Sequence, residues 1–237
     1  MDETFIRTKM LLGEEAMGKL NRAKVVIFGV GGVGSYVAEG LARSGVGKLV
    51  LVDRDVISVS NINRQIHALK STVGLFKTEA MKKRIADINP DAEIKAVNEF
   101  YLPGKEDIID SDADLIVDAV DTVSAKIGLA VYGEKTGIPV ISSMGTGNKL
   151  HPEMLKAADI YDTKVCPLAK VMRRELRIRG VKGLRVVYSE EEPITPLDFG
   201  EALPEGKRQI PGSTAFVPSA AGMIIAAEAV RILTGKN

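Results

Sequence analysis

Cysteine, histidine and tryptophan are nearly missing from this sequence of 237 residues. It has no tryptophan, one cysteine, Cys166, and two histidines, His67 and His151. One cysteine excludes an intrachain disulfide and a four-thiolate zinc site, so we expect no zinc. Neither histidine has a nucleophile or acid partner at a recognisable spacing, and we assign neither a catalytic role.

Charge of one sign and long apolar runs are also scarce. The formal net charge is +1 at pH 7, which gives no overall argument for nucleic acid or a membrane as partner. The first ten residues, MDETFIRTKM, lack the apolar run of a signal peptide. The apolar run at 220–227 is shorter than a membrane span and is followed by Glu228 and Arg231. We therefore expect a cytoplasmic protein without membrane contact.

Short apolar runs alternate with helical patterns along the first part of the chain. The expected strands cover residues 24–29, 48–53, 92–97, 113–120 and 138–144, and the expected helices cover 33–44, 72–90 and 124–137. This alternation predicts an α/β fold with a doubly wound, mostly parallel, Rossmann-like sheet. Ligands are then expected at the carboxyl ends of the strands.

The pattern loosens after Gly147, but no repeat or low-complexity linker divides the chain. The later expected elements are strands at 155–160 and 184–190, an amphipathic helix at 167–180, a loop rich in proline and glycine at 190–213, and a helix at 219–234. We therefore expect one domain over 1–237. Its parts would be a helical N-terminal arm (1–22, with the helix at 10–22), a substrate-facing insertion and loop (148–213) and a C-terminal helix (214–237).

A glycine-rich stretch, FGVGGVGS at 28–35, lies between an expected strand and an expected helix. The spacing Gly29-x-Gly31-x-x-Gly34 in this context is typical of a loop that binds phosphate at a helix N-terminus. Asp53 ends the next strand, where a carboxylate commonly contacts a ribose. A nicotinamide-dependent oxidoreductase would show much the same pattern, so these residues alone leave the nucleotide open.

The polar residues that follow favour a nucleoside triphosphate. They are Asp55, Asn61, Asn63, Arg64, Gln65 and Lys77. A triphosphate needs cations that stabilise the leaving pyrophosphate, whereas a nicotinamide does not. Asp118 and Asp121, at the end of the fourth strand, form a carboxylate pair that suits magnesium. Any one of these residues is also explained by a solvated face or, for Asp121, by a helix cap, but their joint position at strand ends favours an ATP site.

Several motifs, in this order, resemble the adenylating core of the ubiquitin-activating superfamily. They are GVGGVGS, LVDRDVISVSNINRQ, VGLFK and VDAVD. Further segments resemble one branch of it, the tRNA threonylcarbamoyladenosine dehydratases: NINRQIHAL, RIADINP, CPLAKVMRREL, VVYSEE and FVPSAAG. The likeness covers nearly the whole chain.

This resemblance implies an adenylating site and assigns roles to the polar residues. The ATP-binding candidates are Gly29, Gly31, Gly32, Gly34, Asp53, Asp55, Asn61, Asn63 and Gln65. The catalytic candidates are Arg64, Lys77, Asp121, which would also hold magnesium, and Arg7. An N-terminal arginine of one subunit often reaches the partner's ATP site in this superfamily, so Arg7 implies a homodimer.

The branch implies a tRNA substrate and a reaction without a protein nucleophile. The carboxylate of the threonylcarbamoyl group on adenosine 37 would attack the α-phosphate of ATP, and the carbamoyl group would then close a ring with net loss of water. The main alternative is an adenylyltransferase that activates the C-terminal glycine of a ubiquitin-like sulfur carrier. A non-catalytic nucleotide-binding module or an NAD-dependent enzyme would leave Arg64, Lys77 and Asp121 without a role.

Two features favour the dehydratase over the sulfur-carrier activator, which commonly carries paired CxxC motifs for zinc. One is the single cysteine. The other is the segment 164–185, which has eight cations and only Glu175 as an acid. The candidates for tRNA contact there are Lys170, Arg173, Arg174 and Arg177, with a solvated helix face as the alternative. A sulfur-relay protein partner also follows from the resemblance, and we expect Cys166 to be inert although some superfamily members use a catalytic cysteine.

Overall fold

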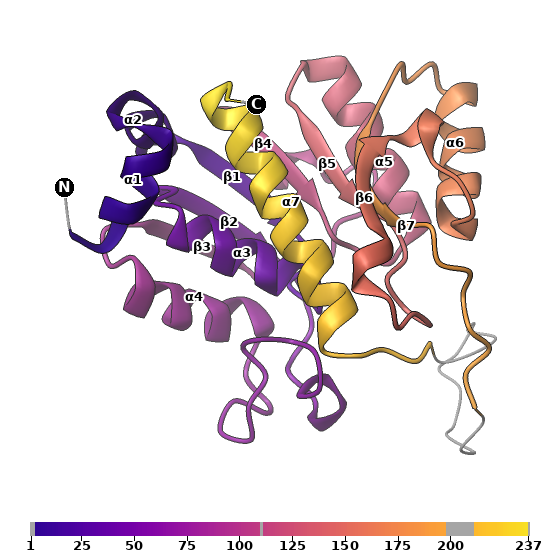
Figure 1. Ribbon diagram of the computed structural model, residues 1–237, viewed down its shortest axis with the longest axis horizontal. Helices are drawn as coiled ribbons and strands as arrows, with labels where there is room; N and C mark the ends of the chain where they lie inside the picture. Colours follow the sequence, from indigo (N-terminus) through magenta and orange to yellow (C-terminus); the bar gives the residue numbers. More distant parts are fainter. Residues whose placement is uncertain (1–2, 110, 198–210, 237) are drawn as a thin grey trace.

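One seven-stranded sheet organises the residues that the computed structural model describes, which are 3–109, 111–197 and 211–236. The strands are β1 (Lys24–Phe28), β2 (Lys48–Val52), β3 (Glu93–Val97), β4 (Leu115–Asp118), β5 (Val140–Ser143), β6 (Leu155–Asp159) and β7 (Arg185–Ser189). Their order is β3-β2-β1-β4-β5-β7-β6, and every neighbouring pair is parallel except β6 with β7. The predicted doubly wound, mostly parallel α/β fold is confirmed (Figure 1).

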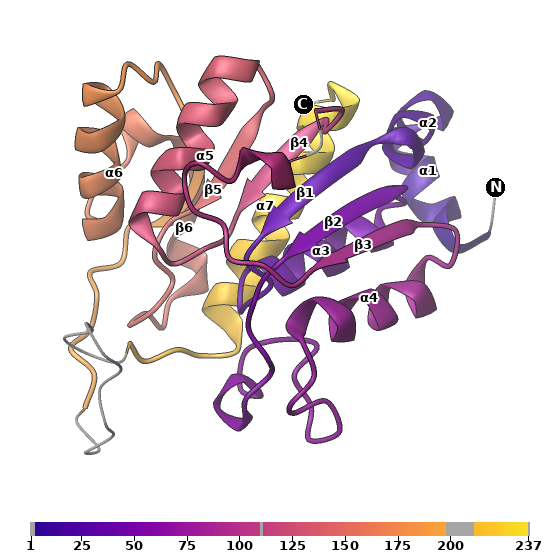
Figure 2. The same cartoon turned by 180° about the vertical axis from the view of Figure 1, so that it is seen from behind.

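Helices cover both faces of this sheet (Figures 1 and 2). They are α1 (Ile6–Leu12), α2 (Glu14–Arg22), α3 (Gly34–Arg43), α4 (Lys77–Ile88), α5 (Val123–Thr136), α6 (Pro167–Ile178) and α7 (Phe216–Thr234). Successive side chains of a strand point to opposite faces. In β1, Val25 and Ile27 join the core under α3 and α7, while Val26 and Phe28 join the core under α5. This two-sided burial explains why the strands are continuous apolar runs.

The helix boundaries differ most from the sequence prediction at α4 and at the N-terminus. The helix expected from residue 72 begins at Lys77. Two residues just before Lys77 form hydrogen bonds with Ile57 and not with the first turn of the helix. The amide of Gly74 donates to Ile57, and that of Ile57 donates to Leu75. At the N-terminus, α1 and α2 are separate helices that meet at Gly13, whose φ is 81°. Of the expected loop at 190–213, residues 198–210 lie outside the described residues, and the single domain over 1–237 stays a prediction.

Helix α7 ends where the helix expected at 219–234 ends, but it begins earlier, at Phe216. By length and composition it is the one helix of the described chain that could cross a membrane. Its buried side chains Val217, Ala221 and Ile225 belong to the same core as α3 and the sheet. Its buried Glu228 accepts hydrogen bonds from Arg185 of β7 and from Arg231. Helix α7 therefore packs as a core helix of the sheet.

A buried ion pair ties the carboxyl ends of β4 and β5 to α5. Lys126 of α5 and Asp118 of β4 have side chains that are 1% and 0% exposed. The Lys126 Nζ donates to the two Asp118 oxygens at 3.1 and 3.2 Å and to the Ser143 carbonyl at 2.6 Å. The Ser142 hydroxyl donates to the same carboxylate. This network fixes the strand ends that form one wall of the site described below.

Removing one member of this pair should leave an uncompensated buried charge. We expect Lys126→Met to lower the free energy of unfolding by about 3–5 kcal/mol, measured by urea unfolding. Lys135→Met is the matched control in the same helix, because Lys135 is exposed, and it should change stability by less than about 0.5 kcal/mol. Adding Asp118→Leu to Lys126→Met should recover part of the loss. A Lys126→Met protein as stable as the control would contradict this account.

Candidate functional site

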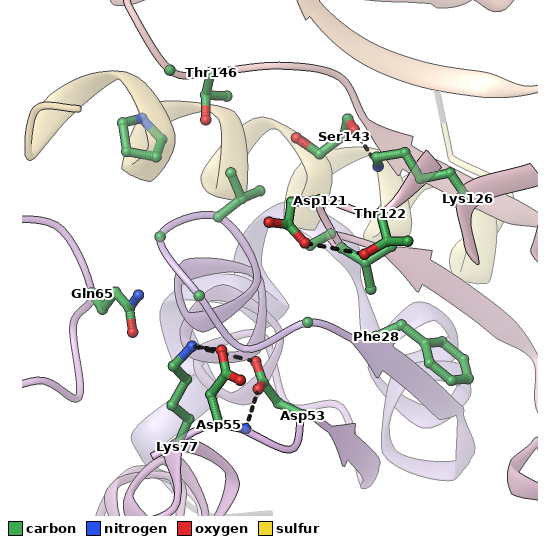
Figure 3. A pocket seen from close by; sticks show the side chains of 18 of the residues that line it. Phe28, Asp53, Asp55, Gln65, Lys77, Asp121, Thr122, Lys126, Ser143 and Thr146 are labelled. Atoms are coloured by element: carbon green, nitrogen blue, oxygen red, sulfur yellow. Dashed lines mark hydrogen bonds and ion pairs between the residues drawn. The ribbon is translucent and has the colours of Figure 1, made fainter. Parts of the chain in front are cut away.

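A cavity of about 800 Å³ lies at the carboxyl ends of β1, β2, β4 and β5 (Figure 3). It is lined by most of the residues singled out from the sequence: Gly29, Gly31, Gly32, Asp53, Asp55, Asn61, Arg64, Gln65, Lys77 and Asp121. These residues come from four separate segments of the chain. The parallel sheet brings them together, because the carboxyl ends of its strands meet at one edge.

The glycine loop forms a turn that admits no side chain at two of its positions. A Cβ at Gly34 would lie 1.8 Å from the carbonyl oxygen of Gly29. A Cβ at Gly29 would lie 2.6 Å from the carbonyl oxygen of Ala119, and Gly29 has a φ of +84°. Gly34 is the first residue of α3, so the turn directs the N-terminus of that helix toward the cavity. Backbone amides at a helix N-terminus favour an anion there.

Two carboxylates and a lysine occupy the end of β2. Asp53 accepts hydrogen bonds from the amides of Val30, at 2.8 Å, and Asp55, at 2.9 Å. Lys77, the first residue of α4, has a buried side chain whose Nζ lies 2.7 Å from Asp55 and 4.0 Å from Asp53. Asp53 thus holds the glycine turn, and Lys77 brings a cation to the cavity wall (Figure 3).

Arg64 lies on the connection from β2 to α4, residues 53–76. From here on, 'the arm' means this connection and not the N-terminal residues 1–22. The aliphatic stem of Arg64 lies against Gly32, since a Cβ there would be 3.5 Å from the Arg64 Cγ. Its Nη1 donates to the Ser60 carbonyl and to the Asn63 side chain, both at 2.8 Å. Burial lowers the pKa of Arg64 below its usual value, but a guanidinium stays charged at neutral pH. The arm therefore presents a fixed positive charge beside the glycine turn.

The carboxylate pair expected to suit magnesium is divided by the structure. Asp118 is fully buried, and Lys126 and Ser142 occupy its oxygens, so it is not available to a metal. Asp121 is exposed, lines the cavity and accepts a hydrogen bond from the Thr122 hydroxyl at 3.4 Å. The paired site inferred from the sequence is wrong for Asp118, because a lysine inside α5 neutralises it, and only Asp121 faces the cavity (Figure 3).

Comparison with known proteins places the chain in a family. The profile of the ThiF family matches residues 6–237. A tRNA threonylcarbamoyladenosine dehydratase of Bacillus subtilis is 44% identical over 95% of this chain and 92% of its own length. The Escherichia coli dehydratase is 32% identical over 99% and 94%. The chain belongs to the ThiF family, in the branch of these dehydratases.

Solved structures agree with this assignment. The E. coli dehydratase TcdA in complex with ATP matches with a TM-score of 0.89 and 32% identity, covering 99% of this chain and 95% of that one. E. coli MccB with ATP matches with a TM-score of 0.70 at 20% identity, which shows the fold alone. The resemblance seen in the sequence motifs is therefore confirmed at the level of the branch.

Some candidates do not line the cavity of this ThiF-family protein. Gly34 acts through the turn. Asn63 points its amide nitrogen to the Ser213 carbonyl at 3.0 Å. Arg7 is exposed on α1, which lies at the upper left of Figure 1, whereas the arm lies at the bottom. The cations of α6 lie outside the lining, and Cys166 is buried at the start of α6.

Several lining residues were not singled out from the sequence. Those that follow β3 and β5 are Glu99, Phe100, Tyr101 and the segment 144–147. The rule that ligands bind at strand ends applies equally to them and was the signal that could have found them. Phe100 carries Arg54 over its ring, 4.2 Å from the centroid. Burial raises the pKa of Tyr101 to about 12, so its hydroxyl is neutral. Leu168 and Ser213, by contrast, reach the cavity only through the tertiary fold.

The glycine turn makes a direct prediction about stability. Gly34→Ala should lower the free energy of unfolding by about 3 kcal/mol, because the new methyl group meets backbone rather than a flexible side chain. Gly31→Ala is the control: its Cβ would meet nothing nearer than the Gln65 Nε2 at 3.8 Å. Urea unfolding of both variants is the measurement. Equal stability of the two would show that the turn is not the constraint described here.

Proposed function

We propose that this protein catalyses the ATP-dependent cyclisation, by dehydration, of the threonylcarbamoyl group on adenosine 37 of tRNA. The observation that carries the proposal is the end-to-end match to dehydratases of this name. The cavity supports it, since it gathers a phosphate-binding turn, Arg64 and Lys77 in one place. Their charge complements a triphosphate better than it complements a nicotinamide.

Activation through an adenylate fits both the substrate and these residues. A carboxylate is a poor electrophile because its oxygen leaves poorly. Attack of a carboxylate oxygen on the α-phosphorus gives an acyl-adenylate and releases pyrophosphate. Arg64 and Lys77 offset the negative charge that develops on the phosphates. An oxygen or nitrogen of the carbamoyl group then attacks the acyl carbon and expels AMP, helped by its proximity within the substrate.

Asp121 is the residue we assign to magnesium. Mg²⁺ prefers a few carboxylates together with phosphate oxygens and water rather than a cage of side chains. The described residues contain no group of three or more histidine, cysteine or acidic side chains that could hold a metal. A metal that arrives with ATP and meets one exposed carboxylate fits this composition. When bound, it would neutralise phosphate charge.

The outer face of α6 is the surface we assign to tRNA. Arg173 is engaged with Thr163, and Arg179 with Glu175. Lys170 and Arg174 are exposed, and Arg177 stacks on Tyr161 at 5.0 Å. Leu168, in the first turn of α6, lines the cavity. A tRNA backbone on this face would therefore place a modified nucleoside within reach of the ATP site.

A homodimer gives Arg7 its role. Arg7 does not line the cavity of its own chain, so a role in ATP binding requires that it reach the site of a partner. Its helix α1 also exposes Met10 and Leu11, which are 76% and 85% exposed, as an apolar surface for association. A sulfur-relay partner and a cytoplasmic location stay predictions from the sequence.

The proposed reaction is tested by turnover with modified and unmodified tRNA. The wild-type protein should consume ATP only with threonylcarbamoylated tRNA, and mass spectrometry should show nucleoside 37 lighter by one water. Arg64→Ala should lower the rate about 10²–10³-fold, as the loss of one electrostatic donor does. ATP–pyrophosphate exchange driven by a carrier protein ending in Gly-Gly, with no response to tRNA, would favour the sulfur-carrier activator instead.

The tRNA surface is tested by the salt dependence of binding. The double variant Lys170→Ala with Arg174→Ala should weaken binding and lower the slope of log K against log salt by about 1 for each phosphate that is no longer neutralised by a side chain. Lys82→Ala with Lys83→Ala on α4 removes the same charge from another exposed face. This control should weaken tRNA binding only as much as the change in net charge requires. Equal effects of the two double variants would rule out α6 as the specific surface.

A further inference from the structure

A buried histidine connects the arm to the glycine turn, and no step described above uses it. His67 is 2% exposed, and its Nε2 lies 2.7 Å from the carbonyl oxygen of Val30. A carbonyl only accepts hydrogen bonds, so Nε2 carries a proton and donates it. The second ring nitrogen, Nδ1, is buried and has no hydrogen-bond partner among the described residues.

This arrangement keeps His67 uncharged. Protonation of Nδ1 would bury an N–H group without an acceptor, which is unfavourable. Burial accordingly lowers the pKa of His67, and Lys77 lowers it further, although the bond to Val30 opposes them. His67 therefore gives the turn a directed hydrogen bond rather than a positive charge.

The bonded carbonyl belongs to the peptide that links Val30 to Gly31. The described chain has no cis peptide bond. In a trans peptide the C=O and N–H groups are coplanar and point in opposite directions. A carbonyl held against His67 thus turns the amide of Gly31 to the other side. Gly31 lines the cavity, and Asp53 fixes the preceding amide, that of Val30, at 2.8 Å.

We propose that His67 is a positioning residue that aims the amide N–H of Gly31 at a phosphate of ATP. It does so as the neutral imidazole protonated at Nε2. Because His67 belongs to the arm, the same bond also sets the distance between Arg64 and the glycine turn. This inference rests on the ATP-binding part of the proposed function and does not involve tRNA.

Three substitutions of His67 separate the hydrogen bond from the packing. His67→Gln places an amide nitrogen near the position of Nε2, His67→Asn places one nearer Nδ1, and His67→Leu keeps an apolar side chain without a donor. We expect the Kd for ATP to rise about tenfold in the leucine and asparagine variants. The glutamine variant should stay within about threefold of wild type. Calorimetric titration without tRNA measures these values.

Adenosine is the matched ligand because it has no phosphates. Its affinity should be the same for wild type and the three variants, which a merely structural role of His67 would not give. The inference is overturned if the leucine variant binds ATP as wild type does, or if ATP and adenosine affinities fall together. The titration contains no tRNA, so it tests this inference even if the turnover assay shows that tRNA is not cyclised.

A measurement on the protein with His67 intact covers the case in which the variants fail to fold. His151→Gln removes the exposed histidine and leaves His67 as the only one. Nitrogen-15 NMR should then show a neutral imidazole protonated at Nε2 at pH 7. A proton on Nδ1 instead would contradict the bond to Val30 and overturn the inference.

Discussion

The close approach of Gly34 to the carbonyl of Gly29 is the constraint on which the site depends. It lets β1 turn directly into α3, so the first amides of that helix lie over the end of the sheet. Any side chain at Gly34 would collide with backbone, 1.8 Å away. Asp53 and His67 then hold Val30, which lies inside the turn, at its amide and its carbonyl. The backbone of the turn is therefore fixed by contacts within the protein itself.

Charge is arranged around this turn in two distinct ways. Lys126 and Asp118 form a closed pair that is fully buried, so they shape the wall and add no net charge to it. Arg64 and Lys77 line the cavity from the arm and from α4, and Lys77 is paired there with Asp55. Fixed cations in a partly buried cleft stabilise an anionic transition state without having to reorganise. The two lysines thus differ in their partners: Lys126 pairs with a fully buried carboxylate, whereas Lys77 pairs with one that is exposed.

The sequence predicted the sheet well because buried parallel strands are continuous apolar runs bounded by glycine and charged residues. It did not predict that β6 runs antiparallel to β7, since local pattern carries no information on strand direction. Asp118 was misassigned because the lysine that neutralises it lies eight residues later inside a helix, where no pattern marks it. The start of α4 differs from the prediction for a similar reason: Gly74 and Leu75 bond back to Ile57 rather than starting the helix. The strand-end residues of the site were predictable, whereas contacts made by side chains across the fold were not.

The proposed activation of the substrate's carboxylate as an adenylate can be followed by oxygen labelling. The substrate is tRNA whose threonylcarbamoyl carboxylate carries oxygen-18. Attack on the α-phosphorus followed by expulsion of AMP predicts that one labelled oxygen appears in AMP. Label in inorganic phosphate, or in none of the nucleotide products, would contradict the account.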